Sequence, residues 1–177
     1  MFQGDVGGAG DFFGTSIFNG TLRPGNSPAQ VSFENLVLNG TLEMEIGGNI
    51  PGSGYDQLIG HSHLESSAIL RGALNVSLLS GTSSFFPSLG DTFDLIIANF
   101  VFADFDVINL PELMDGMYFM SRVVELENDL QAFQVWVAGT DASVPEPSSI
   151  ILLAVGLLLL ARSHHQHSGG RYREAAR

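Results

Sequence analysis

Hydrophobic and polar residues alternate along most of the chain between residues 31 and 137, with the two-residue period of a half-buried β-strand. The segment 42–46, Leu-Glu-Met-Glu-Ile, shows this alternation most clearly. In the segment 133–137, apolar residues alternate with Gln134 and Trp136, so one face is expected to point inward. The pattern predicts strands at residues 31–38, 42–46, 67–78, 93–102, 105–110, 117–125 and 130–137.

Residues 4–30 are rich in glycine and contain the turn sequences Asn-Gly and Pro-Gly-Asn-Ser-Pro. Glycine supplies positive φ angles and proline fixes the first corner of a turn, so this segment is expected to form loops around short strands. Since the hydrophobic pattern of residues 1–143 shows no helical period, that part of the chain is predicted to be all-β.

One short phrase recurs along the chain. Residues 19–22, Asn-Gly-Thr-Leu, return at 39–42, and a looser copy of 40–46 returns at 72–78. Strands with recurring turns favour a β-solenoid or a β-sandwich. The predicted fold is therefore all-β: a β-solenoid (parallel β-helix-like) end segment, with a β-sandwich as the alternative, followed by one short C-terminal hydrophobic helix.

Six strand-and-turn phrases occur in a fixed order, at residues 22–28, 42–48, 54–58, 73–78, 90–95 and 105–111. Together they resemble the closing segment of autotransporter-type and related surface β-helix proteins. The resemblance covers about half of the chain. It implies a passenger-like β-solenoid end whose repeated residues build turns and rungs, and it supplies no catalytic residue.

The run Ile150–Ala161 contains no polar side chain. As a helix with Ser149 it would be about 20 Å long, which is short against a hydrocarbon core of about 30 Å. Arg162 follows the run and is placed to reach the lipid headgroups, while prolines mark a non-helical entry at the other end. A membrane helix is therefore expected at about residues 149–161, the alternative being a buried core helix.

The order Pro145-Glu146-Pro147, apolar run and Arg162 resembles the PEP-CTERM sorting signal of Gram-negative surface proteins. The resemblance implies recognition by an exosortase-type membrane protease and cleavage near the Pro-Glu-Pro sequence. It also implies transient residence in the inner membrane, followed by delivery to the cell surface or the extracellular matrix. The tail departs from the usual pattern, because fifteen further residues, rich in His, follow Arg162.

Charge divides the chain in the same way. Eighteen Asp or Glu and three Arg precede Pro147, whereas one Glu and four Arg follow from there on, giving net charges of −15 and +3 and a total of −12. Positive residues beyond a membrane segment mark the cytoplasmic side, so the acidic part is expected to be translocated. The predicted domains are an all-β extracytoplasmic domain at 1–143 and the sorting signal at 144–177. The acidic domain would repel nucleic acid, which excludes nucleic-acid binding.

The first eight residues show neither a basic start nor an apolar run, so no secretory signal is recognised there. A C-terminal sorting signal requires export, and we therefore expect this chain to be the C-terminal part of a longer protein, or its start codon to have been assigned too late. The chain has no Cys, so neither disulfides nor thiol chemistry are expected.

His61, His63 and Glu65 are the best candidates for a metal site. On a strand these three residues share one face and would present two imidazoles and a carboxylate to a metal ion. Three ligands on one strand give a poor coordination geometry, so the favoured alternative is a solvated turn before the strand at 67–78. No cofactor is predicted.

Other candidate chemistry is weaker. Asp104 and Asp106 would suit a general acid and base or a calcium site, but they are better explained as the edge of a strand, because no calcium-loop spacing surrounds them. A disordered tail is favoured over a metal site for His164, His165 and His167.

Two functions remain open. The first is an exported, non-catalytic cell-surface or matrix protein whose partners are the exosortase-type protease, the membrane (through residues 149–161) and, as a further candidate, exopolysaccharide. The second is a fragment of an extracellular carbohydrate-active or metal-dependent enzyme. A groove with clustered Asp, Arg and aromatic side chains would favour the enzyme, and a plain acidic face would favour the surface protein.

Overall fold

The computed structural model describes residues 1–25, 28–61, 65–79 and 85–139, and these residues contain thirteen strands and no helix. The prediction of an all-β body is confirmed. The predicted C-terminal helix at about 149–161 lies outside the described residues. The strands are β1 (Val6–Gly8), β2 (Asp11–Phe18), β3 (Thr21–Pro24), β4 (Gln30–Leu38), β5 (Thr41–Ile46), β6 (Gln57–Gly60), β7 (Ser67–Leu70), β8 (Ala73–Leu78), β9 (Thr92–Ala98), β10 (Phe100–Ala103), β11 (Val107–Asn109), β12 (Met117–Glu125) and β13 (Gln131–Gly139).

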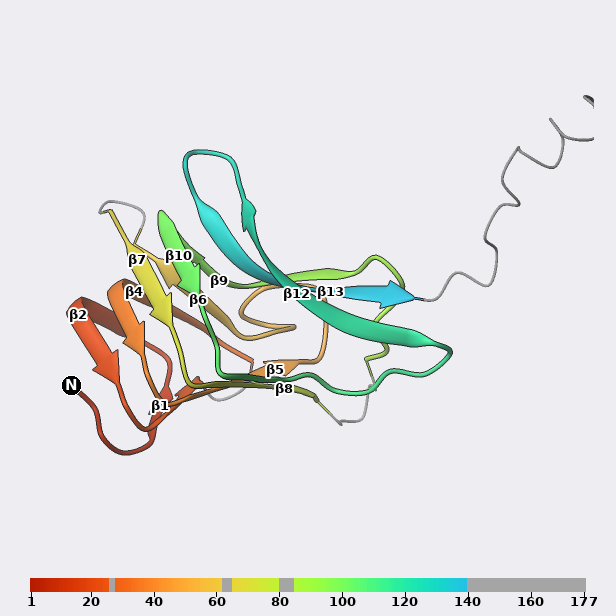
Figure 1. Cartoon of the computed structure of the whole chain (residues 1–177), viewed down its shortest axis with the longest axis horizontal. Helices are drawn as coiled ribbons and strands as arrows, with labels where there is room; N and C mark the ends of the chain where they lie inside the picture. Colours follow the sequence, from red (N-terminus) through yellow and green to blue (C-terminus); the bar gives the residue numbers. More distant parts are fainter. Residues whose placement is uncertain (26–27, 62–64, 80–84, 140–177) are drawn as a thin grey trace, which may run out of the picture. The chain divides into compact units, whose positions relative to one another are not determined.

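The strands form two sheets (Figure 1). The five-stranded sheet has the order β1-β3-β5-β8-β11, and all of its strands are parallel. The eight-stranded sheet has the order β10-β7-β4-β6-β9-β13-β12, with β2 added beside β4. Its strands are parallel except at β13, which is antiparallel to both of its neighbours.

The chain passes repeatedly from the eight-stranded to the five-stranded sheet. We call each such passage a coil: β2 leads into β3, β4 into β5, β7 into β8, and β10 into β11. Consecutive coils stack in register, because Leu22 pairs with Leu42, Leu42 with Leu74, and Leu74 with Ile108. The intervals of 20 and 32 residues seen in the sequence repeat are therefore the actual pairing offsets of these coils.

The repeated Asn-Gly phrase forms a corner between the two sheets. Asn39 donates a side-chain hydrogen bond of 2.9 Å from Nδ2 to Oδ1 of Asn19 in the coil before it. The backbone N–H of Thr41 donates to the carbonyl oxygen of Gly20 at 3.0 Å. A Cβ atom at Gly40 would overlap that same carbonyl, so this corner requires glycine because of its neighbour and not because of its φ angle.

Alternate side chains of both sheets fill the space between them. The inward-facing residues of segment 42–46 are completely buried, as the alternation predicts. Phe93 is completely buried in this core, and its ring makes edge contacts with Tyr55 at 5.4 Å and Phe119 at 6.1 Å between centroids. Both sheets together give the body a nearly barrel-shaped form around one core.

The hairpin β12–β13 follows the last parallel coil. Its strands occupy residues 117–125 and 131–139, close to the predicted 117–125 and 130–137. Phe133, Val135 and Val137 point into the core, as expected from the alternation. Asn128 and Asp129 adopt positive φ angles of 60° and 57° in the connecting loop, a conformation that short polar side chains tolerate. Because β13 runs antiparallel to β9, it ends the parallel stacking at this side of the body.

Candidate functional site

The predicted processing residues Pro145, Glu146, Pro147 and Arg162 lie outside the described residues, as does the apolar run Ile150–Ala161. Among the residues that are described, we find no helix with the length and apolar character needed to cross a bilayer. The structural description of a site is therefore confined to the β-rich body.

A polar groove of about 430 Å³ lies along the outer face of the five-stranded sheet. It is formed because every second residue of β3, β5 and β8 points away from the core. The strand register brings Arg23, Glu43 and Asn75 into one row across three strands. The lining residues are Arg23, Pro24, Gly25, Glu43, Glu45, Asp56, Asn75 and Ser77.

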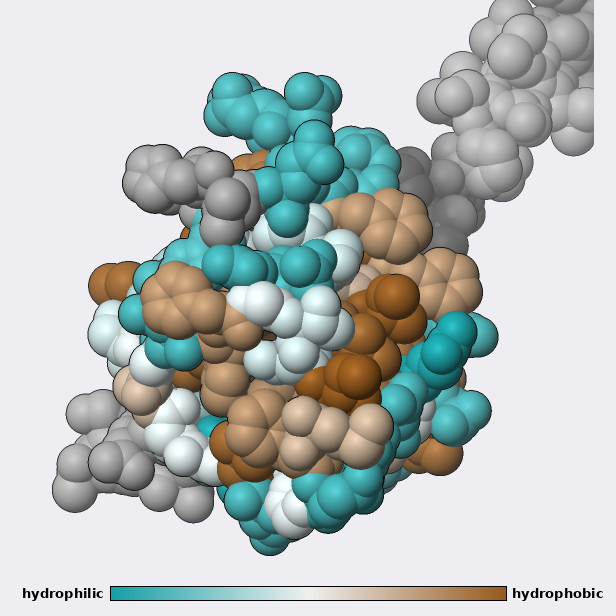
Figure 2. Space-filling model, turned by 90° about the vertical axis from the view of Figure 1, so that its left-hand side faces the viewer, coloured by the Kyte–Doolittle hydropathy of each residue, from teal (hydrophilic) through white to brown (hydrophobic). Residues whose placement is uncertain are grey.

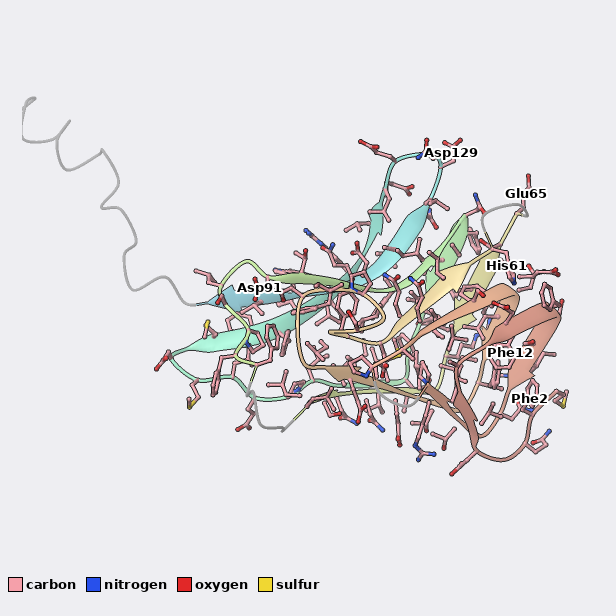
Figure 3. All side chains as sticks on the ribbon, turned by 180° about the vertical axis from the view of Figure 1, so that it is seen from behind. Phe2, Phe12, His61, Glu65, Asp91 and Asp129 are labelled. Carbon is pink, nitrogen blue, oxygen red and sulfur yellow. The ribbon has the colours of Figure 1, made fainter. Side chains whose placement is uncertain are left out.

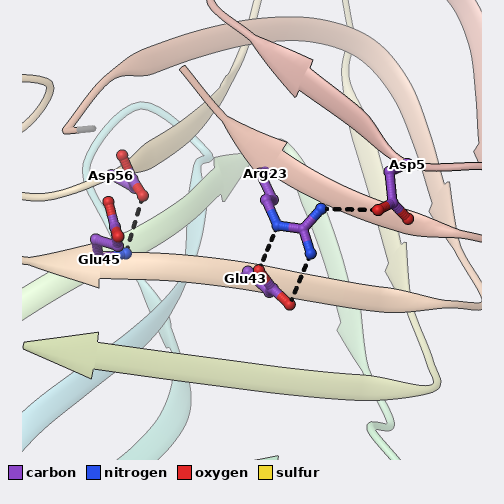
Figure 4. A network of polar contacts seen from close by, with 5 residues as sticks. All are labelled: Asp5, Arg23, Glu43, Glu45 and Asp56. Atoms are coloured by element: carbon purple, nitrogen blue, oxygen red, sulfur yellow. Dashed lines mark hydrogen bonds and ion pairs between the residues drawn. The ribbon is translucent and has the colours of Figure 1, made fainter. Parts of the chain in front are cut away.

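Arg23 is held between two carboxylates in this groove (Figure 4). Its guanidinium donates to Glu43 through Nε at 2.5 Å and Nη2 at 3.2 Å, and to Asp5 through Nη1 at 3.1 Å. The hydrogen bond from Arg23 lowers the pKa of Asp5, and the hydrogen bond to Glu43 raises the pKa of Arg23. All three side chains are exposed, so the ion pairs orient the guanidinium more than they stabilise the fold.

Asp56 lies at the end of the groove and is only 2% exposed. Its Oδ1 accepts a hydrogen bond from the backbone N–H of Ala29 at 2.7 Å. Its Oδ2 accepts one from the backbone N–H of Glu45 at 2.9 Å, which Figure 4 shows. Burial raises the pKa of Asp56 to about 6, although the two backbone hydrogen bonds act in the opposite direction. Asp56 therefore joins the segment before β4 to β5, at the cost of desolvating its carboxylate.

A second polar network lies on the outer face of β9, β13 and β12. Gln134, which is 8% exposed, donates from Nε2 to Oδ1 of Asp94 at 2.7 Å. Its Oε1 accepts hydrogen bonds from Nε and Nη2 of Arg122 at 3.1 and 2.8 Å. The Arg122 guanidinium lies 4.6 Å from the ring centroid of Trp136, which is a cation–π distance. The network fixes one cation over the single tryptophan of the chain.

His61 and Glu65 lie in the connection between β6 and β7 and not within a strand, and His63 lies outside the described residues. The ring of His61 stacks on Phe13 at 4.9 Å, and Glu65 is exposed. Figure 3 labels both residues at the same end of the body. The shared strand face on which the predicted metal site depends is not formed by the described residues. In that part of the chain, no group of three His, Cys, Asp or Glu side chains is arranged to hold a metal ion.

Asp104 and Asp106 flank the corner between β10 and β11, and both are exposed. The backbone N–H of Asp104 donates to the carbonyl of Leu70, and that of Asp106 to the carbonyl of Gly72. Their backbone N–H groups therefore bond to the preceding coil, and both residues lie outside β10 and β11, in the corner between these strands. The tail residues His164, His165 and His167 lie outside the described residues.

Sequence reasoning missed both polar networks. The groove could have been found, because the 20- and 32-residue offsets of the repeat place Arg23 beside Glu43 and Glu43 beside Asn75. No pattern in the sequence indicates that Asp56 and Gln134 are buried, because their burial depends on which loop or strand covers each side chain.

Comparison with known families matches residues 143–164 to the PEP-CTERM protein-sorting motif. This match supports the sorting signal and indicates export through exosortase-type sorting, in which a membrane protein processes the signal. Such a signal implies a protein that passes through the membrane and is secreted or directed to the surface. No curated protein matches the chain. The matched segment does not include the body, so the likeness of residues 22–111 to autotransporter-type β-helix ends stays a prediction.

Proposed function

We propose that this protein is a non-catalytic cell-surface or extracellular-matrix protein that is delivered by its C-terminal sorting signal. The observation that carries the proposal is the sorting motif at residues 143–164, which contains the Pro-Glu-Pro sequence and the whole apolar run Ile150–Ala161. In this proposal the segment 149–161 resides transiently in the inner membrane, and Arg162 marks its cytoplasmic end. An exosortase-type membrane protease then cleaves near Pro145-Glu146-Pro147 and separates domain 1–143 from signal 144–177.

The released domain would act as a β-solenoid end segment. Its parallel coils in register favour a solenoid over a β-sandwich, because the sheets of sandwiches are antiparallel. A solenoid aligns equivalent side chains of successive coils in rows, which suits display of a regular surface. The row formed by Arg23, Glu43 and Asn75 is such a surface.

Exopolysaccharide is the partner that we propose for this surface. The groove offers a guanidinium, carboxylates, an amide and the Ser77 hydroxyl, which are donors and acceptors suited to sugar hydroxyl groups. The domain is strongly acidic, with a net charge of −15 before Pro147, so a neutral polysaccharide fits better than an anionic polymer. The same charge disfavours nucleic acid.

The sorting step is tested with a reporter that carries an export signal and residues 144–177, in a host that contains an exosortase. The reporter should reach the cell surface. Replacing Pro145, Glu146 and Pro147 with Ala should leave it uncut in the inner membrane, whereas Ala at residues 165–167 should leave sorting unchanged. Normal processing of the Pro-Glu-Pro variant would contradict the assignment.

The polysaccharide step is tested separately with the full chain in mild detergent, by affinity electrophoresis through gels that contain isolated neutral surface polysaccharide. The wild-type protein should be retarded, and Arg23→Ala and Asn75→Ala should lose the retardation. Glu127→Gln, on the exposed hairpin loop, serves as the control and should behave as wild type. Equal mobility with and without polysaccharide would refute this partner and leave the sorting assignment untouched.

A further inference from the structure

The two ends of the stack of coils differ. At the C-terminal end, the antiparallel strand β13 covers the outer edge of β9, whereas among the described residues β10 pairs only with β7 and β11 only with β8. At the other end, β1 pairs only with β3 among the described residues. Likewise β2 pairs with β4 along one edge, while its other edge meets only the isolated bridge between Phe2 and Phe18. Main-chain groups of β1 and most of β2 therefore face outward at this end.

This N-terminal end is also apolar. The rings of Phe2 and Phe18 stack at 4.8 Å, and Phe12 packs edge-on against Phe18 at 5.2 Å and Phe2 at 6.0 Å. Phe2, Phe12 and Val6 are only partly buried. Figure 2 shows this side of the molecule, with hydrophobic side chains gathered across its centre. Figure 3 places Phe2 and Phe12 together at that end. The core is thus less completely covered here than between the coils.

The corner glycines supply an independent observation. A Cβ atom at Gly20 would overlap the carbonyl of Gly4, one at Gly40 would overlap that of Gly20, and one at Gly72 would overlap that of Gly40. Each glycine therefore makes room for the corner carbonyl of the coil before it. Gly4 belongs to the same column, because the pairs Phe2–Phe18 and Val6–Leu22 place it opposite Gly20.

Gly4 alone in this column has no such neighbour among the described residues. No atom lies within 4 Å of the position that its Cβ would occupy, and its φ angle is not positive. Neither a contact nor the backbone conformation seen here accounts for glycine at this position. The carbonyl of Gly20 lies against Gly40, and that of Gly40 lies against Gly72. A corner carbonyl of a further coil, lying against Gly4 in the same way, would account for glycine at this position.

We propose that the N-terminal end of the body is built to accept a further parallel coil, supplied by the same polypeptide on the N-terminal side of Phe2. The strand that contains Phe2 would continue backwards along Thr15–Ile17 of β2, following the register set by the Phe2–Phe18 bridge. The next corner would set its carbonyl against Gly4. This addition continues the interface that already joins the coils, and it covers both the open strand edges and the phenylalanine cluster.

A second copy of this chain is a poorer occupant. To stack in the same direction it would have to offer the edge of its last parallel coil, where β13 covers β9 and leaves only the short strands β10 and β11 open. The inference rests on the packing of the coils and is independent of the proposed function.

The test uses the full chain in mild detergent and a copy of residues 11–37 fused directly before Phe2 in place of Met1. In this extended chain the copied Gly20 corner would lie against Gly4. The added segment should resist protease, and the amides of Thr15–Ile17 should exchange more slowly with deuterated solvent than in the original chain. The dependence of unfolding on urea should become steeper, because more surface is buried on folding.

Glycine variants supply the matched control. Gly4→Ala should leave the urea midpoint of the original chain unchanged or slightly raised, since nothing lies near the added methyl group. In the extended chain the same substitution should lower the midpoint, as Gly20→Ala is expected to do in the original chain. Equal effects of Gly4→Ala in both chains would overturn the proposal. Rapid proteolysis of the added segment with native Gly4 would also overturn it, even where the variant of the extended chain does not fold.

Discussion

The substitution Asp56→Asn tests the reasoning about the buried carboxylate. Asn has the same shape as Asp but carries only one acceptor oxygen, whereas Asp56 accepts from the backbone N–H groups of both Ala29 and Glu45. In the variant, the amide NH₂ must face one of these N–H donors. Loss of one hydrogen bond with a buried donor left unsatisfied costs about 1–3 kcal/mol.

The charge of Asp56 acts in the opposite direction. Its pKa is raised from 3.8 to about 6 in the folded protein, so between these pH values the folded chain binds a proton that the unfolded chain has released. The free energy of unfolding therefore falls as the pH rises through this window. The stabilisation is fully present below pH 3.8 and is lost above about pH 6. The size of the pKa change corresponds to about 3 kcal/mol.

Asn cannot titrate, so the variant lacks this dependence on pH. At pH 4 both side chains are largely neutral, and we expect Asp56→Asn to lower the free energy of unfolding by about 1–3 kcal/mol. Near pH 7 the wild-type protein carries a buried charge that the variant lacks. The difference should then be close to zero or should favour the variant, because about 3 kcal/mol of the wild-type advantage has been lost.

The measurement is urea unfolding of the full chain in mild detergent at both pH values. Asp129→Asn makes the same chemical change at an exposed loop position whose φ of 57° suits Asn, so its effect should stay below about 0.5 kcal/mol at each pH. A cost of Asp56→Asn that does not change with pH, or that grows towards pH 7, would refute the assignment of a desolvated carboxylate.

Three further substitutions probe other contacts. Gly40→Ala should lower the free energy of unfolding by about 1–3 kcal/mol, because its methyl group meets a backbone carbonyl of the preceding coil; urea midpoints measure this. Arg23→Ala should cost less than about 1 kcal/mol, and high salt should reduce the effect, because its ion pairs are exposed. Gln134→Ala should free the guanidinium of Arg122 from Trp136 and change the emission of this single tryptophan, without loss of the β-type circular dichroism spectrum.

Much of the fold follows from local patterns in the sequence. Alternation located most of the strands, including 117–125 at its observed bounds, because a sheet with one buried face imposes a period of two on the residues that form it. It merged β7 with β8 and β9 with β10 into single strands, and it did not predict β6. Alternation is silent about which strands are neighbours. The alternation therefore could not predict that β13 runs antiparallel to β9, whereas the preceding coils are parallel.

The repeat carried that missing information for the middle of the chain, since identical phrases stack most favourably on one another. Thr41 and Leu42 pair with Thr21 and Leu22 exactly one repeat earlier, and this register brings Glu43 beside Arg23. The groove was therefore contained in the sequence. Asp56 was not, because its role depends on backbone N–H groups of Ala29 and Glu45 that no side-chain pattern can indicate.

Asn39-Gly40 shows why a motif can be located correctly and still be understood only from the structure. Asn-Gly commonly indicates a tight turn, where glycine supplies a positive φ angle. In this protein φ is not positive at Gly40. Glycine is required there because a Cβ atom at residue 40 would overlap the carbonyl oxygen of Gly20 in the preceding coil. The constraint thus comes from a residue 20 positions away. A glycine at each corner therefore indicates that another coil stacks against that corner. A glycine in that column without a neighbour, as at Gly4, is then informative about what else stacks there.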